Sequence, residues 1–315
     1  MKWQCISRAV GALRLSLQTG RAWFYLGVSC LWAGSLKVTR PLLWPRARVH
    51  PDQPGDHPSL SGRVLIVAPH PDDETLGAGG TAALHARRGD QVIIVTVTDG
   101  RSSQAASLSP TAMARQRASE AEAAAATLGV WELVQLGLPE NTWQTEVARN
   151  TLKPLVDSAD LVYGPSCVDF HPDHLQVARL LAELVRPAQA VRVYELQVPL
   201  TPLLANRVFD VRSVVAEKRR ALACYATQQA TLGTQQRVGR YRAALYGQAE
   251  VEVFWEMPGK AYRAVMERGT WNWRASPFRG FRPRPFSDPL AFLSGWRMRR
   301  HLWERAASAG AGPQP

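Results

Sequence analysis

The chain has 315 residues, 46% hydrophobic and 20% charged, so it is long and apolar enough to bury the core of a globular protein. Its four cysteines are scattered without a CxxC pair, which excludes a disulfide framework and a zinc ribbon and favours a reducing compartment, the cytoplasm. The net charge of +12 is concentrated at the two ends: basic outnumber acidic residues 8 to 2 in residues 1–60 and 11 to 3 in residues 259–315, against 19 to 21 in residues 61–258.

The two basic ends also hold most of the tryptophans. Of the 11 in the chain, only three lie in residues 61–258. Tryptophans interleaved with cations suit the headgroup layer of an anionic membrane, which we expect these ends to contact. Nucleic acid would accept the same mixture, but no nucleic-acid motif accompanies it, so we expect no such partner. A basic solvated tail with buried tryptophans is the remaining alternative.

Within residues 1–60, a basic and partly apolar extension, Ala22–Leu36 is uncharged. At about 1.5 Å per residue, a helix of this length is shorter than a hydrocarbon core of roughly 30 Å, which indicates an interfacial or re-entrant segment rather than a span. A signal peptide is an alternative, but the preceding arginines are dispersed and no clear A-x-A site follows. Residues 49–62, rich in Pro, Asp, Ser and Gly, then read as a linker.

From there, strand-like and helix-like runs alternate through the central domain, residues 61–258. This alternation predicts an α/β fold with a Rossmann-like, mostly parallel sheet and helices on both faces. Residues 259–315 form the basic aromatic C-terminal extension. The expected strands are Val64–Ala68, Gln91–Thr98, Glu132–Leu136, Leu161–Tyr163 and Val191–Leu196, and the expected helices are Leu76–Arg88, Thr111–Leu128, Trp143–Asp157 and Asp173–Val185.

A glycine-rich run, Gly77 to Ala82, matches the G-x-G-x-x-A pattern of dinucleotide-binding sites. In such sites the first glycine directly follows the strand. Here an ionic cluster lies between Ala68, at the strand end, and Gly77. Close packing of a helix is therefore the better explanation of these glycines.

Three polar clusters follow three expected strands. His70 to Glu74 follow the first, Asp99 and Gly100 follow the second, and "DFHPDH" follows the strand that ends at Tyr163. Because functional groups of parallel sheets gather at the carboxyl ends of strands, we expect these clusters at one edge.

The first and third clusters carry metal-ligand residue types. His70 and Asp73, spaced i, i+3, can converge on one cation, and an open zinc site needs a third ligand. In HPDH, one of His171 and His174 can bind the metal while the other faces substrate. A divalent cation offsets the repulsion among the adjacent carboxylates and leaves Asp72 as a candidate base that takes the proton as water attacks a carbonyl. His171 can then stabilise the oxyanion.

These elements resemble the PIG-L/LmbE-like metal-dependent N-acetylglucosaminyl deacetylases. The resemblance runs from about Val64 to Gln228 and rests on "APHPDDE", "VTVTDG", "RASEAEAAAATLG", "LGLPE", "HPDH" and "KRRALACYATQ". It implies an enzyme that uses Zn²⁺ or another divalent cation to remove an N-acetyl group from an amino sugar. The roles it implies are metal ligands His70, Asp73 and His174; catalytic base Asp72; transition-state stabiliser His171; histidine-orienting Asp173; and substrate-edge residues Arg117 and Glu120.

Two stretches depart from the family pattern. Glu140 stands in "LGLPE" where the family usually has Asp, and "SCVDF" before HPDH matches no family pattern. We place both near the substrate, with Glu140 and Asp99 as candidate contacts. Arg117 and Glu120, at i, i+3, have a surface ion pair as their alternative interpretation.

We therefore expect a zinc-dependent deacetylase of an N-acetylglucosamine-type substrate, including a lipid-linked one, that is cytoplasmic and peripheral to the membrane. One alternative is the same chemistry on a soluble glycoside or another amide. Another is a peripheral membrane module that binds metal without catalysis. Asp72 and His171 favour an enzyme, because a binding module needs neither a free base nor an oxyanion partner. The sequence leaves the oligomeric state open.

Overall fold

The computed structural model describes residues 31, 51–52, 62–103, 106–166, 169, 171–196, 200, 204–228, 246, 250–267, 302 and 304–311. These residues contain an eight-stranded sheet with the order β1-β7-β8-β6-β5-β2-β3-β4. The strands are β1 (Pro51–Asp52), β2 (Arg63–Ala68), β3 (Gln91–Thr98), β4 (Glu132–Leu138), β5 (Leu161–Pro165), β6 (Ala190–Tyr194), β7 (Arg207–Asp210) and β8 (Val251–Pro258).

The sheet is parallel from β4 to β6, and β8 runs antiparallel to both of its neighbours, β6 and β7. β1 pairs in parallel with β7 at the edge. The expected α/β fold with a mostly parallel sheet is confirmed. β1, β7 and β8 were not predicted, and β1 lies within residues 49–62, which were expected to form a linker.

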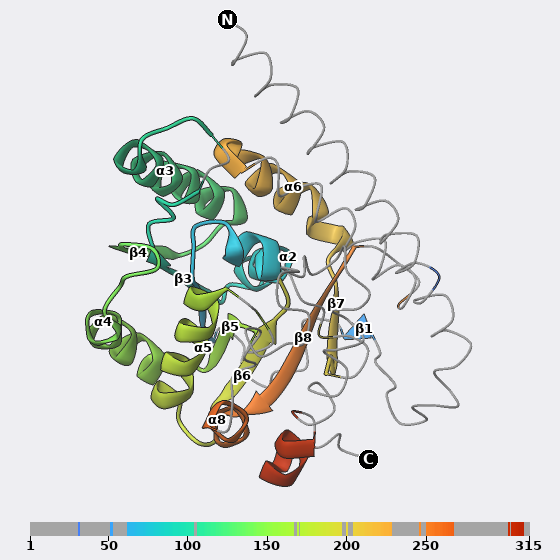
Figure 1. The fold of residues 1–315 in the computed structure, drawn as a ribbon. Helices are drawn as coiled ribbons and strands as arrows, with labels where there is room; N and C mark the ends of the chain where they lie inside the picture. Colours follow the sequence, from blue (N-terminus) through green and yellow to red (C-terminus); the bar gives the residue numbers. More distant parts are fainter. Residues whose placement is uncertain are drawn as a thin grey trace, which may run out of the picture.

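Helices cover both faces of the sheet (Figure 1). α2, α3 and α6 contact one another on one face, and α5 contacts α4 and α8 on the other. The helices are α2 (Asp73–Arg87), α3 (Pro110–Leu128), α4 (Thr145–Ser158), α5 (Pro172–Leu184), α6 (Val215–Cys224) and α8 (Gly259–Glu267), with short turns η1 (Arg212–Val214), η2 (Ala226–Gln228) and the π-helical η4 (Ala307–Ala311).

Local sequence explains why the central elements form where they do. β2 and β3 are apolar on both faces and almost wholly buried, as strands between two helical layers must be. α3 begins at Pro110 after Ser109, whose hydroxyl accepts from the Ala112 amide, and it ends at Gly129, which has a positive φ. α5 begins in the same way, with Pro172 after the capping residue His171.

The strand order places a topological switch point between β2 and β5. The chain passes from β2 outward through β3 and β4, and then returns to β5 on the other side of β2. In open parallel sheets such a switch point opens a crevice at the carboxyl ends of the strands, where ligands bind. The loops after β2 and β5 carry the first and third polar clusters, so both flank this crevice.

The glycines of α2 allow close packing, as expected. A Cβ on Gly77 would lie 2.8 Å from Cγ of the buried Tyr194 in β6. A Cβ on Gly80 would lie 2.8 Å from Cβ of Val211. Helix packing therefore accounts for this pattern, and the preference over a dinucleotide-binding loop is supported.

Part of the C-terminal extension belongs to the central core. The Tyr262 hydroxyl in α8 donates to the Ala178 carbonyl of α5, and Leu302 and Ala306 are buried in the same apolar cluster. The fold thus continues beyond the predicted boundary at residue 258. Most other residues of the two extensions, including Ala22–Leu36 apart from Leu31, lie outside the described residues. Within the part that is described, no helix is both long and apolar enough to cross a bilayer.

Candidate functional site

The loop between β2 and α2 presents the first group of site residues. His70, Asp72 and Asp73 are all buried, and Asp73 opens α2. The Asp73 carboxylate accepts from the backbone amide of His70 at 3.0 Å, which folds the turn back on itself. The turn thereby holds the His70 and Asp73 side chains side by side.

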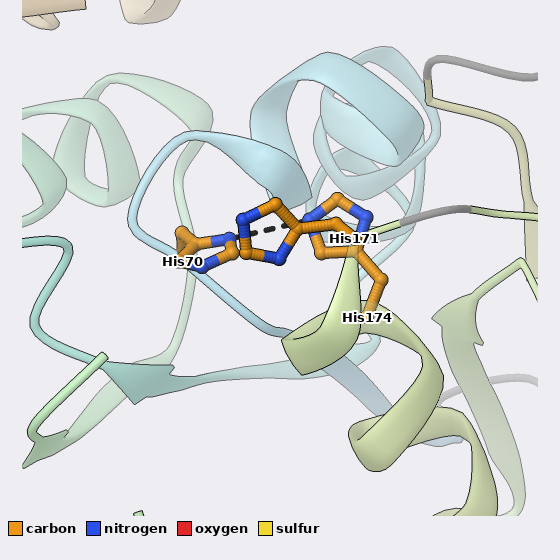
Figure 2. Close-up of side chains that lie close together, drawn as sticks. All are labelled: His70, His171 and His174. Atoms are coloured by element: carbon orange, nitrogen blue, oxygen red, sulfur yellow. Dashed lines mark hydrogen bonds between the residues drawn. The ribbon is translucent and has the colours of Figure 1, made fainter. Parts of the chain in front are cut away.

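The start of α5 presents the second group. His171, Asp173 and His174 lie in the first turn of the helix, and the rings of His171 and His174 gather around that of His70 (Figure 2). Asp173 and His174 are almost fully buried. Residues about a hundred positions apart in the sequence therefore meet at the switch point, as expected from the strand ends.

Three donor atoms form a nearly equilateral triangle. His70 Nδ1 lies 3.1 Å from Asp73 Oδ2, His174 Nε2 lies 3.2 Å from the same oxygen, and the two nitrogens are 3.2 Å apart. Atoms bound tetrahedrally to zinc at 2.0–2.2 Å are themselves separated by about 3.3 Å. The predicted ligand set therefore fits a divalent cation.

Two other groups of possible ligand residues lie around this triangle, and both contain His70. One combines His70, His171 and His174, and the other combines His70 with Glu140, His171 and Asp173, with donor atoms within 4.8 Å of one another. The separations of His171 Nε2 and His70 Nε2 from Glu140 Oε1 are 4.0 and 3.6 Å. The triangle with Asp73 is tighter and is therefore the better candidate for a metal site.

Each candidate histidine ligand is oriented by a buried carboxylate. His70 Nε2 lies 3.1 Å from Asp173 Oδ2, and His174 Nδ1 lies 2.8 Å from Asp169 Oδ2. Hydrogen bonding to His70 outweighs the effect of burial and lowers the pKa of Asp173, so this carboxylate is ionised and accepts. Although burial opposes it, the pKa of His70 is raised by Asp173 and Asp73, and the pKa of His174 is raised by Asp169 and Asp73. A cation would replace the protons on His70 Nδ1 and His174 Nε2, while the two orienting carboxylates keep the protons on His70 Nε2 and His174 Nδ1.

The Asp173 carboxylate is itself fixed by two further donors. The indole Nε1 of the buried Trp143 donates to Oδ1 at 3.0 Å, and the Asn141 amide donates to Oδ2 at 3.2 Å. The Asp173 carboxylate is thus held against His70 Nε2. Trp143 adds a support that the sequence analysis did not foresee.

Asp72 lies beside the triangle in a strained backbone conformation. Its φ is +122° and its ψ is −28°, a region that residues with a Cβ rarely occupy. Burial, with the neighbouring Asp73 and Glu74 charges, raises the pKa of Asp72 to about 7, and the Arg117 guanidinium opposes the shift. A carboxylate with such a pKa is suited to general-base chemistry near neutral pH.

His171 is the most accessible of the three histidines. Its side chain is 28% exposed. Burial, together with His70 and His174, lowers the pKa of His171 to about 4, so the ring is neutral. Because Nδ1 accepts from the Asp173 amide at 3.3 Å, the proton resides on Nε2, which can donate a hydrogen bond to a ligand.

The four predicted substrate-edge residues lie in different surroundings. Glu140 Oε2 accepts from the Ser102 amide, while Oε1 faces His70 and His171, so Glu140 borders the candidate metal site. Asp99 pairs with Arg101 at the loop after β3.

Arg117 and Glu120 do not form a surface ion pair, which was the alternative interpretation of their i, i+3 spacing. Both are buried, and each binds different partners. Arg117 contacts Pro71, Asp72 and Gly100, and Glu120 accepts from the backbone amide and hydroxyl of Thr227.

The sequence analysis missed Asp169, Trp143 and Tyr225. Asp169 lies within "SCVDF", which we had placed near the substrate, but its carboxylate holds His174 and also accepts from the His171 amide at 2.9 Å. Tyr225, from the end of α6, donates to Glu74, whose other oxygen accepts from the Asp72 amide at 3.1 Å. A carboxylate two residues before HPDH was the available signal for Asp169.

Residues 65–185 match the family described as PIG-L: GlcNAc-PI de-N-acetylase. The resemblance to the PIG-L family that the sequence motifs indicate is confirmed over this span. The matched span contains the triangle of His70, Asp73 and His174 together with Asp72 and His171, and it ends just after α5.

The curated relatives of this chain share one named activity. A 1D-myo-inositol 2-acetamido-2-deoxy-alpha-D-glucopyranoside deacetylase from Kineococcus radiotolerans is 34% identical over 141 residues, covering 42% of this chain and 38% of the relative. A protein of the same name from Mycobacterium sp. (strain KMS) is 32% identical over 160 residues, covering 41% and 52%. The match thus spans about half, or less, of the length of these relatives.

Solved structures support the fold. The N,N'-diacetylchitobiose deacetylase from Pyrococcus horikoshii superposes with a TM-score of 0.56 at 23% identity, covering 64% of this chain and 86% of that protein. At this identity the similarity supports the α/β architecture of the PIG-L domain. The relatives and this structural neighbour are deacetylases, which are amide hydrolases.

Proposed function

We propose that the chain is a metal-dependent hydrolase that removes the N-acetyl group from an N-acetylglucosamine-type substrate. The observation that carries the proposal is the triangle of His70 Nδ1, Asp73 Oδ2 and His174 Nε2 with Asp72 beside it. Three ligands make an open site, and a carboxylate next to it that is not itself a ligand is what metal-assisted hydrolysis requires. The deacetylase activity for which the relatives are named supports the same reaction.

His70, Asp73 and His174 would hold the cation, for which we propose Zn²⁺. When bound, it supplies Lewis acidity, which polarises a carbonyl oxygen and makes water a stronger nucleophile at neutral pH. Asp169 and Asp173 keep the two imidazoles in the tautomer and orientation that binding needs.

Asp72 is the proposed general base. Its carboxylate takes the proton from the water that attacks the acetyl carbonyl, and the same group can return that proton to the sugar nitrogen as the C–N bond breaks. The products are acetate and a free amine.

His171 is the proposed oxyanion partner. As a neutral ring with its proton on Nε2, it donates a hydrogen bond to the carbonyl oxygen as negative charge develops there. Asp99 and Glu140 are proposed to border the sugar, since both lie on loops at the same edge of the sheet.

The compounds to test are chosen from the substrates named for the relatives, the matching family and the structural neighbour. Zinc-loaded protein should release acetate from N-acetylglucosamine linked to inositol, from its phosphatidylinositol counterpart, or from N,N'-diacetylchitobiose, with a free amine appearing in equal amount. The rates would rank lipid-linked against soluble substrates. Absence of acetate from all three, with bound metal confirmed, would refute the deacetylase proposal.

A membrane surface remains our proposal for the site of action, supported by the charge and tryptophan content of residues 1–60 and 259–315. Each Lys or Arg near an anionic surface contributes about 1 kcal/mol, and salt screens it. The full chain should cosediment with phosphatidylglycerol vesicles at low salt more than with phosphatidylcholine vesicles. Equal binding to both would remove this part of the proposal.

A further inference from the structure

Arg117, on α3, directs its guanidinium into the loop that carries Asp72. Nη2 donates to the Pro71 carbonyl and lies 3.1 Å from Asp72 Oδ1, while Nη1 donates to the Gly100 carbonyl at 3.3 Å. Arg117 is only 4% exposed. One side chain thus ties together the loops that follow β2 and β3.

The loop needs such a restraint because Asp72 is strained. A φ of +122° at a residue with a Cβ costs about 1–3 kcal/mol and persists only where surrounding contacts enforce it. The Glu74 carboxylate restrains the Asp72 amide from one side. Arg117 restrains the preceding carbonyl and the Asp72 carboxylate from the other.

Gly100 lies against the Arg117 guanidinium and leaves room for it because glycine has no Cβ. A Cβ at this position would lie 2.6 Å from Cζ of Arg117. Gly100 also has a φ of +62°, which glycine adopts without strain. The loop after β3 therefore leaves room for Arg117 and offers its carbonyl as an acceptor.

We propose that Arg117 is a positioning residue that holds the Asp72 carboxylate in its working orientation, and that it does not contact the substrate as the family resemblance implies. The proposal rests on the proposed function in one respect, the role of Asp72 as base. A substrate contact must be reachable from the crevice, whereas both terminal nitrogens of Arg117 are buried and engaged by the chain's own oxygens. A planar guanidinium can bridge these oxygens, and a lysine ammonium cannot.

The kinetic test compares three variants. Arg117→Lys keeps the charge but loses the bridge, Gly100→Ala displaces the guanidinium without altering it, and Arg115→Lys is the control at an exposed arginine of the same helix. Misplacement of a reacting group by about 1 Å costs on the order of 10²-fold. We expect kcat to fall by about that factor in the first two variants with KM within about twofold, and the control to match the unaltered chain. A substrate contact would instead raise KM.

A second readout does not depend on activity. Hydrogen exchange of peptides covering residues 69–76 reports whether the loop is held, since the Asp72 amide donates to Glu74 and the Asp73 amide donates to the His70 carbonyl. Exchange should be faster in both Arg117→Lys and Gly100→Ala. Unchanged exchange in the two variants, or a raised KM with unchanged kcat, would overturn the positioning role.

The two proposals can fail separately. If the unaltered, metal-loaded chain releases no acetate from any compound of the panel, the deacetylase proposal fails, and exchange still decides whether Arg117 holds the loop. If the chain is active but exchange is the same in every variant, only the role of Arg117 is refuted.

Discussion

Asp169 Oδ2 lies 2.8 Å from Nδ1 of His174, and both side chains are buried. The carboxylate fixes the proton on Nδ1 and so leaves Nε2 free to face His70 and Asp73. Asp169 also accepts from the His171 amide, which anchors the residue that caps α5. One carboxylate therefore sets the tautomer of a candidate ligand and the start of the helix that carries it.

This relationship predicts that Asp169→Asn weakens metal binding. The amide can donate to His174 Nδ1 and so favour the opposite tautomer, and loss of such an orienting partner typically costs 10–100-fold in affinity. Zinc affinity is measured on metal-free protein by competition with a chelator. Asp99→Asn, which alters a carboxylate paired with Arg101, is the matched control. Equal affinity in Asp169→Asn and the control would contradict the prediction.

Substitutions of the proposed metal ligands and of the proposed base should affect metal content and activity differently. Asp72→Asn and His171→Ala should keep the metal of the purified protein but lose activity, by about 10²–10⁴-fold for the base. His70→Ala and His174→Ala should lose most of the metal. Metal content by atomic absorption and acetate release from the same samples give the two readouts. An Asp72→Asn protein without metal would make Asp72 a ligand.

Much of the site could be predicted because its residues are local in sequence. His70, Asp72 and Asp73 lie in one turn, His171 and His174 lie in another, and parallel strands bring both turns to one edge. The partners of Arg117 and Glu120 could not be predicted, because i, i+3 spacing fixes the helix face and not the loops that the face meets. β7 and β8 were missed for a related reason, since β8 pairs with β6 and β7 pairs with β8, and these pairings join segments that a local sequence pattern does not connect.

Close packing of α2 on β6 predicts an unequal response of two glycines. Gly77→Ala would push Cβ into the ring of the buried Tyr194, and overpacking of this kind costs typically 1–3 kcal/mol. Gly79→Ala is the control on the same helix, since its Cβ would meet Thr75 Cγ2 at 3.2 Å and it gains helix propensity. Urea unfolding should show a clear loss of stability for Gly77→Ala and a smaller change for Gly79→Ala. Equal changes would contradict the packing account.

Acid should destabilise the fold partly through His85, a buried histidine of α2 remote from the metal triangle. His85 Nδ1 donates to Asp90 at 2.6 Å, and Nε2 accepts from the Tyr163 hydroxyl at 2.9 Å, which itself accepts from Arg192. Burial is the largest influence and lowers the pKa of His85 below its ordinary value of 6.5, with Arg192 adding to the shift and Asp90 opposing it.

The sign of the effect follows from linkage. Below about pH 6.5 the unfolded chain takes up a proton at His85 before the folded chain does, so acidification favours unfolding until the lowered folded pKa is passed. His85→Asn keeps a donor for Asp90 but cannot titrate in this range. Its unfolding free energy should be lower than that of the unaltered chain at pH 7.5, because the bond to Tyr163 is lost, and should fall less between pH 7 and pH 5. If the two proteins lose stability equally over this interval, protonation of His85 has no part in acid unfolding.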